Sequence, residues 1–142
     1  MKKGKKMERY KVILVDDEAE VIDMIEKKIH WNDLGFEVAG SATNGVKALE
    51  LVEKLQPDVV LTDIKMPYMD GLELSRRLNR EYPNIYIMLC TGFDEFEYAK
   101  EAVHLEIKEY MLKPVNATEL SESLTNLKHT LDRERELSLI HI

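Results

Sequence analysis

The chain contains one cysteine, Cys90, among its 142 residues, so no disulfide can form within it. A single thiol fits a reducing compartment. Cys90 ends an apolar run with no histidine near it in sequence, so we expect a buried, unreactive side chain rather than a nucleophile. No apolar run approaches the ~20 residues of a membrane-spanning helix, and the charges from Glu8 onward exclude a signal peptide. We therefore expect a cytoplasmic protein that does not enter the membrane.

Positive charge is also scarce. The chain has 20 Lys and Arg against 27 Asp and Glu, a formal net charge of -7 at pH 7, whereas non-specific nucleic-acid binders are usually basic. The only basic cluster lies within residues 1–8, which we interpret as a disordered leader or as residues added for expression. We therefore expect no nucleic-acid contact by this domain. An apolar content of 44% is sufficient for one folded domain.

Five short apolar runs alternate with five amphipathic segments. The runs are rich in β-branched residues, as buried parallel strands are, and the amphipathic segments carry apolar residues at helical spacing. Strict alternation with short connections indicates an α/β fold, a parallel sheet with helices on both faces. Strands are predicted at residues 11–15, 36–41, 58–62, 85–90 and 108–112, and helices at 19–30, between Asn44 and Pro57, at 72–80, at 93–103 and from Asn116 to Leu131.

The end of the domain is predicted near Leu131, so that residues 9–131 form the folded unit. Asn116 and Glu119 resemble a capping box that starts the last helix. The mixed charges of residues 132–136 are typical of a solvated helix surface, and the apolar residues 137–142 have no evident partner within the domain. We interpret 132–142 as a linker or an added end rather than a dimer contact, with the output domain absent.

Polar side chains directly follow four of the five predicted strands. They are Asp16 and Asp17 after the first strand, Asp63 after the third, Thr91 after the fourth, and Lys113 and Pro114 after the fifth. Ligands of open α/β sheets bind in the crevice outside the carboxyl ends of the strands. Three carboxylates, a hydroxyl and an ammonium group in one crevice suit a hard divalent cation together with a phosphoryl group.

The chemistry of the set favours Mg²⁺ and an aspartyl phosphate. Crowded carboxylates repel one another unless a cation joins them, and Mg²⁺ binds through one or two carboxylates plus phosphate oxygens. Asp63 is the best candidate nucleophile, because cation, hydroxyl and ammonium would converge on it. Lys113 would bring a second positive charge to the phosphoryl oxygens, and Thr91 would donate a hydrogen bond.

Each cluster alone has a plainer interpretation. Asp16 and Asp17 could cap the helix that follows them. Asp63 and Thr91 could be turn residues, and Lys113 could be a solvated lysine at a strand end. All of these interpretations would have to coincide at successive strand ends, so the functional interpretation is favoured.

Together these residues resemble the receiver domain of bacterial two-component response regulators, from about Tyr10 to Leu131. The motifs that carry the resemblance are Val15–Glu18 (Val-Asp-Asp-Glu), Asp63–Pro67 (Asp-Ile-Lys-Met-Pro), Met69–Gly71 (Met-Asp-Gly), Thr91-Gly92 and Tyr110–Pro114 (Tyr-Met-Leu-Lys-Pro). The resemblance implies a flavodoxin-like (βα)5 fold, a doubly wound five-stranded parallel sheet in the order 2-1-3-4-5. It implies phosphoryl transfer from a sensor histidine kinase, with self-catalysed phosphotransfer and dephosphorylation only, so the domain is not expected to be an enzyme.

By this resemblance, Asp63 is the phosphoacceptor. Asp16, Asp17 and Asp63 bind the Mg²⁺ ion, and the backbone carbonyl of Lys65 supplies a further ligand. In related aspartyl-phosphate phosphatases a second Asp typically occupies the position of Lys65, which argues against that enzyme class.

The resemblance also implies a switch. Thr91 and Lys113 hold the phosphoryl oxygens, and the bond from Lys113 to Pro114 is expected to be cis. Thr91 moves toward the phosphoryl group while the aromatic Tyr110 turns inward. The rearranged face, made by the fourth helix, the fifth strand and the fifth helix, often dimerises, so we expect a phosphorylation-linked homodimer.

Two segments resemble receivers attached to AraC-type helix-turn-helix domains, namely Trp31–Phe36 and Thr91–Lys100. Ordinary packing would also explain their aromatic residues. The resemblance implies transcription regulation, with DNA bound through the absent output domain.

Glu106 departs from the family, whose members often have Gly at this position before the fifth strand. If the backbone there requires a positive φ, a residue other than Gly would be strained. The alternative function is a phosphate-independent receiver-like interaction module.

Overall fold

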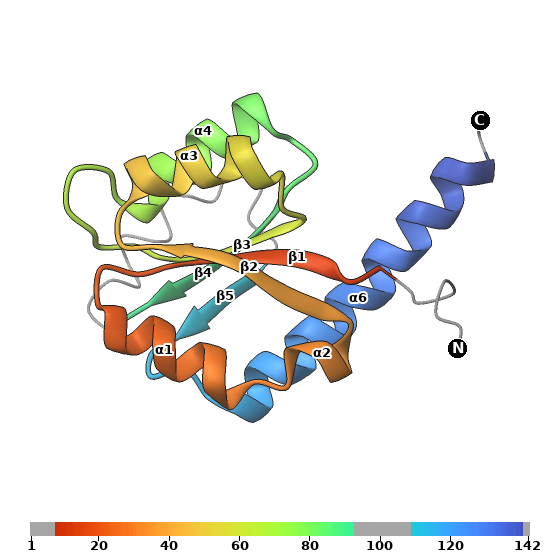
Figure 1. The fold of residues 1–142 in the computed structure, drawn as a ribbon, viewed down its shortest axis with the longest axis horizontal. Coiled ribbons are helices and arrows are strands. Elements are labelled where there is room, and N and C mark those ends of the chain that lie inside the picture. Colours follow the sequence, from red (N-terminus) through yellow and green to blue (C-terminus); the bar gives the residue numbers. More distant parts are fainter. Residues whose placement is uncertain (1–7, 93–108, 141–142) are drawn as a thin grey trace.

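Five parallel strands form one sheet in the computed structural model, which describes residues 8–92 and 109–140 of the chain. The strand order is β2-β1-β3-β4-β5 (Figure 1). The strands are β1 (Tyr10–Val15), β2 (Phe36–Ala42), β3 (Val59–Asp63), β4 (Tyr86–Thr91) and β5 (Glu109–Leu112). The predicted flavodoxin-like fold with the order 2-1-3-4-5 is therefore confirmed.

Five helices are described: four of them begin close to the predicted positions, and the last ends nine residues beyond the predicted Leu131. They are α1 (Ala19–Lys28), α2 (Trp31–Leu34), α3 (Gly45–Leu55), α4 (Gly71–Glu81) and α6 (Ala117–Ile140). The predicted helix at 93–103 and the unusual Glu106 lie outside the described residues. The four-residue α2 was not predicted, because one turn carries no apolar repeat; it ends at Gly35, whose φ is +91°. No described helix has the length and hydropathy needed to cross a membrane.

Apolar side chains of the sheet pack on both of its faces, as expected for parallel strands. Alternate residues of β1 point to opposite faces, so Val12 belongs to one core and Ile13 to the other. Helices α1, α2 and α6 cover the first face, while α3 and α4 cover the second (Figure 1). The central strand β3 is buried along its whole length, which fixes the position of the residues at its carboxyl end.

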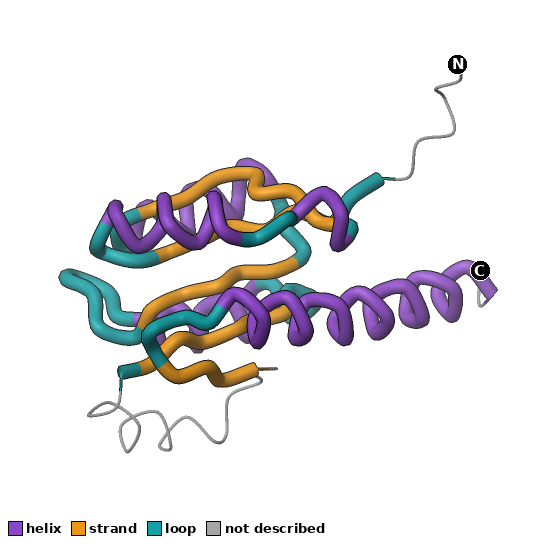
Figure 2. The backbone as a smooth tube through the Cα atoms, turned by 90° about the horizontal axis from the view of Figure 1, so that it is seen from below, coloured by secondary structure: helices purple, strands orange, loops and turns teal. Residues whose placement is uncertain are grey.

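Helix α6 begins where the capping pattern predicts. The backbone N–H of Glu119 donates to Oδ1 of Asn116 at 2.9 Å, satisfying one of the free N–H groups of the first turn. The helix then continues past Leu131 to Ile140, and Figure 2 shows it running beyond the end of the sheet. The boundary after Leu131 stays a prediction, but no change in backbone conformation marks it.

The far part of α6 is attached to the amino ends of two strands. The hydroxyl of Tyr10 donates to Asp132 and that of Tyr86 donates to Glu134, each at 2.5 Å. The guanidinium group of Arg135 lies 4.7 Å from the centre of the Tyr10 ring, within cation–π range. Residues 132–135, expected to be only a solvated helix surface, therefore also contact the domain.

Candidate functional site

The polar residues predicted from the strand ends all lie at the carboxyl edge of the sheet. Asp63 is the last residue of β3 and pairs in register with Cys90 of β4. Asp16 directly follows β1, Thr91 ends β4, and Lys113 directly follows β5. The order of the strands places β1 and β4 on either side of β3, so Asp63 occupies the middle of this edge.

Lys113 joins the two buried carboxylates. Its Nζ lies 3.1 Å from Oδ2 of Asp16 and 3.1 Å from Oδ1 of Asp63. The Lys113 side chain is 25% exposed and both carboxylates are 6% exposed, so these ion pairs are only partly screened by water. The interpretation of Lys113 as a solvated strand-end lysine is therefore wrong.

Backbone N–H groups hold the two carboxylates in orientation. The N–H of Ile64 donates to Oδ1 of Asp63 at 2.9 Å, and the N–H of Glu18 donates to Oδ1 of Asp16 at 2.9 Å. The second of these bonds lies at the start of α1, where Glu18 occupies the N-cap position without a side-chain capping bond. Asp16 thus accepts a hydrogen bond at the start of α1 with one oxygen and contacts Lys113 with the other. It therefore both supports the helix start and belongs to the candidate site.

Asp17 completes a group of three carboxylates. Asp16, Asp17 and Asp63 each offer one carboxylate oxygen, and these oxygens lie within 4.8 Å of one another. Asp16 and Asp63 are buried and Asp17 is exposed. Three carboxylate oxygens that are open to solvent at Asp17 suit a hard divalent cation that keeps several of its waters, as Mg²⁺ does. The three residues therefore fit a metal ion of this class.

Burial and crowding change the protonation of Asp63. Burial, followed by the negative charge of Asp16, raises its pKa from 3.8 to about 6, although Lys113 and the Ile64 N–H act in the opposite direction. Burial also opposes the charge of Lys113, but its bonds and charge interactions with Asp63 and Asp16 outweigh burial, so the pKa of Lys113 lies above its ordinary value. Lys113 therefore stays charged while Asp63 is close to titrating.

The two predicted switch residues, Thr91 and Tyr110, differ in exposure. Thr91 is buried, and its hydroxyl donates to the backbone oxygen of Gly92 at 3.0 Å. The side chain of Tyr110 is 40% exposed. The structure thus brings Thr91 to the edge beside Asp63 with its hydroxyl bonded elsewhere.

The loop after β3 packs closely behind Asp63. Gly71, the first residue of α4, donates its N–H to the oxygen of Ile64 at 2.6 Å. A Cβ atom on Gly71 would collide with the backbone oxygen of Asp63. The sequence predicts only a turn here, from Pro67 and from the Asp70-Gly71 pair before a helix. Lys65 lies in the same loop.

Two predictions outside the charged set are also met. The bond between Lys113 and Pro114 is cis, and the N–H of Lys113 donates to the Thr91 oxygen at 2.8 Å. Cys90 is buried, and burial raises the pKa of its thiol to about 12, as expected for an unreactive cysteine.

Comparison with known proteins identifies the family. Residues 12–125 match the family model described as the response regulator receiver domain. The chain belongs to this family. Receiver domains of response regulators act with histidine kinases and are generally not classical enzymes.

Similar proteins come from several bacteria. The transcriptional regulatory protein YesN of Bacillus subtilis (strain 168) is 42% identical over 125 residues, which are 88% of this chain but 34% of YesN. The REC domain of AraT, a response regulator from Geobacillus stearothermophilus, is 39% identical with a TM-score of 0.85, covering 89% of this chain and 98% of that one. The chain spans about a third of YesN.

A further solved structure bears on the subfamily. The two-component transcriptional regulator AraC from Clostridium phytofermentans is 30% identical with a TM-score of 0.82, covering 89% of this chain and 98% of that one. The predicted likeness of this receiver to receivers of AraC-type regulators is therefore confirmed.

Proposed function

We propose that this receiver takes a phosphoryl group from a sensor histidine kinase onto Asp63 and thereby switches an output, which is transcription. The observation that carries the proposal is the arrangement of one ammonium group 3.1 Å from two buried carboxylates. A third carboxylate lies within 4.8 Å of both. The chain's membership of the receiver family supports the same conclusion.

In the proposed transfer, a carboxylate oxygen of Asp63 attacks the phosphorus atom of a phosphohistidine. A new P–O bond forms, the P–N bond breaks, and the imidazole leaves with the electron pair. Lys113, which lies against Asp63 and is charged, offsets the negative charge of the phosphoryl oxygens. Asp16, Asp17, Asp63 and the Lys65 carbonyl would hold Mg²⁺, which would supply further positive charge at this point.

The nucleophile must be ionised to react. With a pKa of about 6, Asp63 is largely ionised at pH 7.5 and increasingly protonated below pH 6. Transfer should therefore weaken as the pH falls through 6, because a proton and a phosphoryl group compete for the same oxygens. A bound cation favours the carboxylate form and moves this limit to lower pH.

The switch begins with Thr91. Its hydroxyl must leave the Gly92 oxygen to donate to a phosphoryl oxygen, and the half-exposed Tyr110 then turns inward. The change reaches the surface of β5 and its neighbouring helices and promotes a homodimer. An unchanged sedimentation coefficient with and without a phosphoryl mimic would contradict this step.

The remaining parts of the proposal concern the setting. The domain acts in the cytoplasm, makes no DNA contact itself and acts on DNA through an output domain, as the likeness to AraC-type regulators suggests. Residues 1–8 are a leader or residues added for expression, and residues 132–142 are a linker or an added end. The receiver is not an enzyme, because it acts on its own side chain.

Intact mass after incubation with acetyl phosphate tests the central assignment. We expect one Mg²⁺-dependent phosphoryl adduct on the wild type and on Asp23→Asn, which changes an exposed aspartate of α1. Asp63→Asn should show no adduct. An adduct of equal yield on Asp63→Asn would overturn the assignment, and no adduct on any protein would favour a phosphate-independent interaction module.

A further inference from the structure

A second polar pocket lies at the opposite edge of the sheet from Asp63. It has a volume of about 460 Å³ and lies between the end of α1, the short α2 and the start of β2. Glu37, which lines it, pairs with Lys11 at the amino end of β1, whereas the phosphoryl site follows the carboxyl end of that strand. The pocket is therefore separate from the proposed phosphorylation site, and its volume is typical of a small-molecule site.

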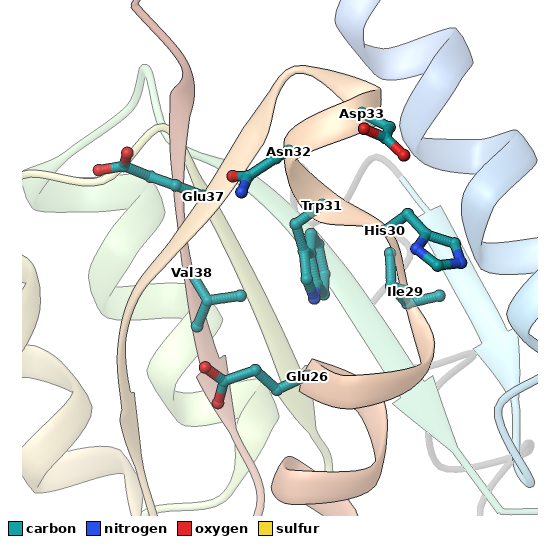
Figure 3. Close-up of a pocket in the computed structure, with 8 residues that line it drawn as sticks. All are labelled: Glu26, Ile29, His30, Trp31, Asn32, Asp33, Glu37 and Val38. Atoms are coloured by element: carbon teal, nitrogen blue, oxygen red, sulfur yellow. The ribbon is translucent and has the colours of Figure 1, made fainter.

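Trp31 places an unsatisfied hydrogen-bond donor at this pocket. The residue is 6% exposed, and its Nε1 is buried without a partner among the described residues. Figure 3 shows the indole in the middle of the lining residues, with the ring nitrogen directed toward Glu26. An indole N–H can only donate, and leaving a buried donor unpaired is costly. A ligand that satisfies it must bring an acceptor oxygen.

The charged side chains that line the pocket are all acidic, while Arg9, which does not line it, donates to the backbone oxygen of Asn32. Glu26, Asp33 and Glu37 line it, are exposed, and form no ion pair with a described residue. No Lys or Arg is among the described residues that line it. Three carboxylates around one pocket attract cations, and a tryptophan ring is the best aromatic partner for a cation.

We propose that this pocket binds an organic cation that carries a carbonyl or carboxylate oxygen, with arginine as the best match. The guanidinium group would lie beside Glu26, in the negative field of the more distant Asp33 and Glu37, and the oxygen would accept from Nε1 of Trp31. The ligand is either a free basic amino acid or a basic residue within a segment of a partner protein. This binding is independent of the phosphorylation proposed above.

Trp31 itself supplies the measurement, because it is the only tryptophan and gives a single indole N–H signal. We would titrate the ¹⁵N-labelled protein with Nα-acetyl-L-arginine amide, free L-arginine, Nα-acetyl-L-citrulline amide and guanidinium chloride. The expected result is a saturable downfield shift of the indole signal with both arginine ligands. Neutral citrulline, with the same shape, should bind at least about tenfold more weakly, and guanidinium chloride, which has no acceptor oxygen, should not reproduce the shift.

Exposed carboxylates allow a test in which the fold is preserved. The double variant Asp33→Asn with Glu37→Gln should weaken arginine binding about tenfold, whereas Glu50→Gln, an exposed glutamate of α3, should leave it unchanged. Tighter binding of free arginine would identify a small molecule, and tighter binding of the acetylated amide a partner's chain. An unmoved indole signal, a non-saturable shift, or equal binding of citrulline would overturn the proposal.

Discussion

The two edges of the sheet differ in how their charged groups are paired. At the carboxyl edge, Asp16 and Asp63 share one ammonium group from Lys113. At the amino edge, Tyr10 and Tyr86 each donate to a separate carboxylate of α6. One edge therefore keeps two carboxylates close together, whereas at the other edge the two tyrosine hydroxyls donate to different carboxylates.

The same contrast appears in protonation. Burial, followed by the hydrogen bonds to carboxylates, raises the pKa of both Tyr10 and Tyr86 from 10.0 to about 12. Burial and Asp16 raise the pKa of Asp63 to about 6. In all three cases the folded chain favours the protonated form. At neutral pH the tyrosines have that form and Asp63 does not, so the two tyrosines stabilise the fold under the conditions in which the ionised Asp63 weakens it.

Gly71→Ala tests the carboxyl edge most severely. The added Cβ would meet the backbone oxygen of Asp63 and the Cα of Ile64, neither of which can move without displacing β3. We expect a loss of about 3 kcal/mol in the free energy of unfolding, measured by urea denaturation. Gly40→Ala is the control, because its Cβ would meet only the flexible Leu55 and Leu51 side chains, at 3.2 and 3.4 Å. Equal losses for both variants would contradict this account.

Asp63→Asn should stabilise the metal-free domain at neutral pH. The folded-state pKa of Asp63 is about 6 against 3.8 unfolded, so its protonated form stabilises the fold below pH 4 and this contribution is lost as the pH rises through 6. Removing the charge should restore about 2 kcal/mol at pH 7.5. Thermal unfolding from pH 4 to 8 should show this gain shrinking toward pH 4. A gain independent of pH would exclude the electrostatic cause, and Asp33→Asn, an exposed residue, serves as control.

The amino edge should respond in the opposite direction. Tyr10→Phe and Tyr86→Phe each remove one hydroxyl that donates to α6, and each should cost about 1 kcal/mol. Hydrogen exchange should become faster in the last turns of α6 while the strands stay protected. Tyr68→Phe is the matched control, because Tyr68 is 92% exposed. Unchanged exchange in α6 would mean that the two hydroxyls do not hold the helix.

The start of α6 offers the smallest of these effects. Asn116→Ala removes the acceptor for the Glu119 N–H and should cost about 1 kcal/mol or less in the free energy of unfolding. Asn116→Asp should restore most of that loss, since its carboxylate accepts the same bond and favours the helix start. A loss that Asp does not recover would point to packing of Asn116 rather than capping.

Much of the fold follows from local patterns in the sequence. The β-branched runs and the apolar spacing predict each described strand and the four longer described helices, because these elements bury whole faces. The short α2 is not predicted by these patterns, because it holds a single turn. The length of α6 is not predicted either, because Asp132 and Glu134 accept hydrogen bonds from Tyr10 and Tyr86, which are far away in sequence.

The sequence predicts which residues form the site, but not their hydrogen bonds and side-chain conformations. Residues that follow strand ends in a parallel sheet share an edge whatever their side chains do, which is why Asp16, Asp63 and Lys113 were expected together. The bond from Thr91 to Gly92 and the free donor of Trp31 depend on rotamers set by packing. No spacing of residues in the sequence encodes either of them.

Helix α6 also connects the two edges of the sheet. It begins three residues after cis Pro114, on the segment that carries Lys113, and passes the amino ends of β1 and β4 before it ends. Its 24 residues correspond to a length of about 36 Å. A tilt of about 5° at the first turn, with the helix straight, displaces its far end by about 3 Å. The Tyr10 and Tyr86 hydroxyls hold the helix at Asp132 and Glu134, about 10 Å before its end. These two bonds oppose such a tilt, so they fix the direction in which the helix leaves the domain.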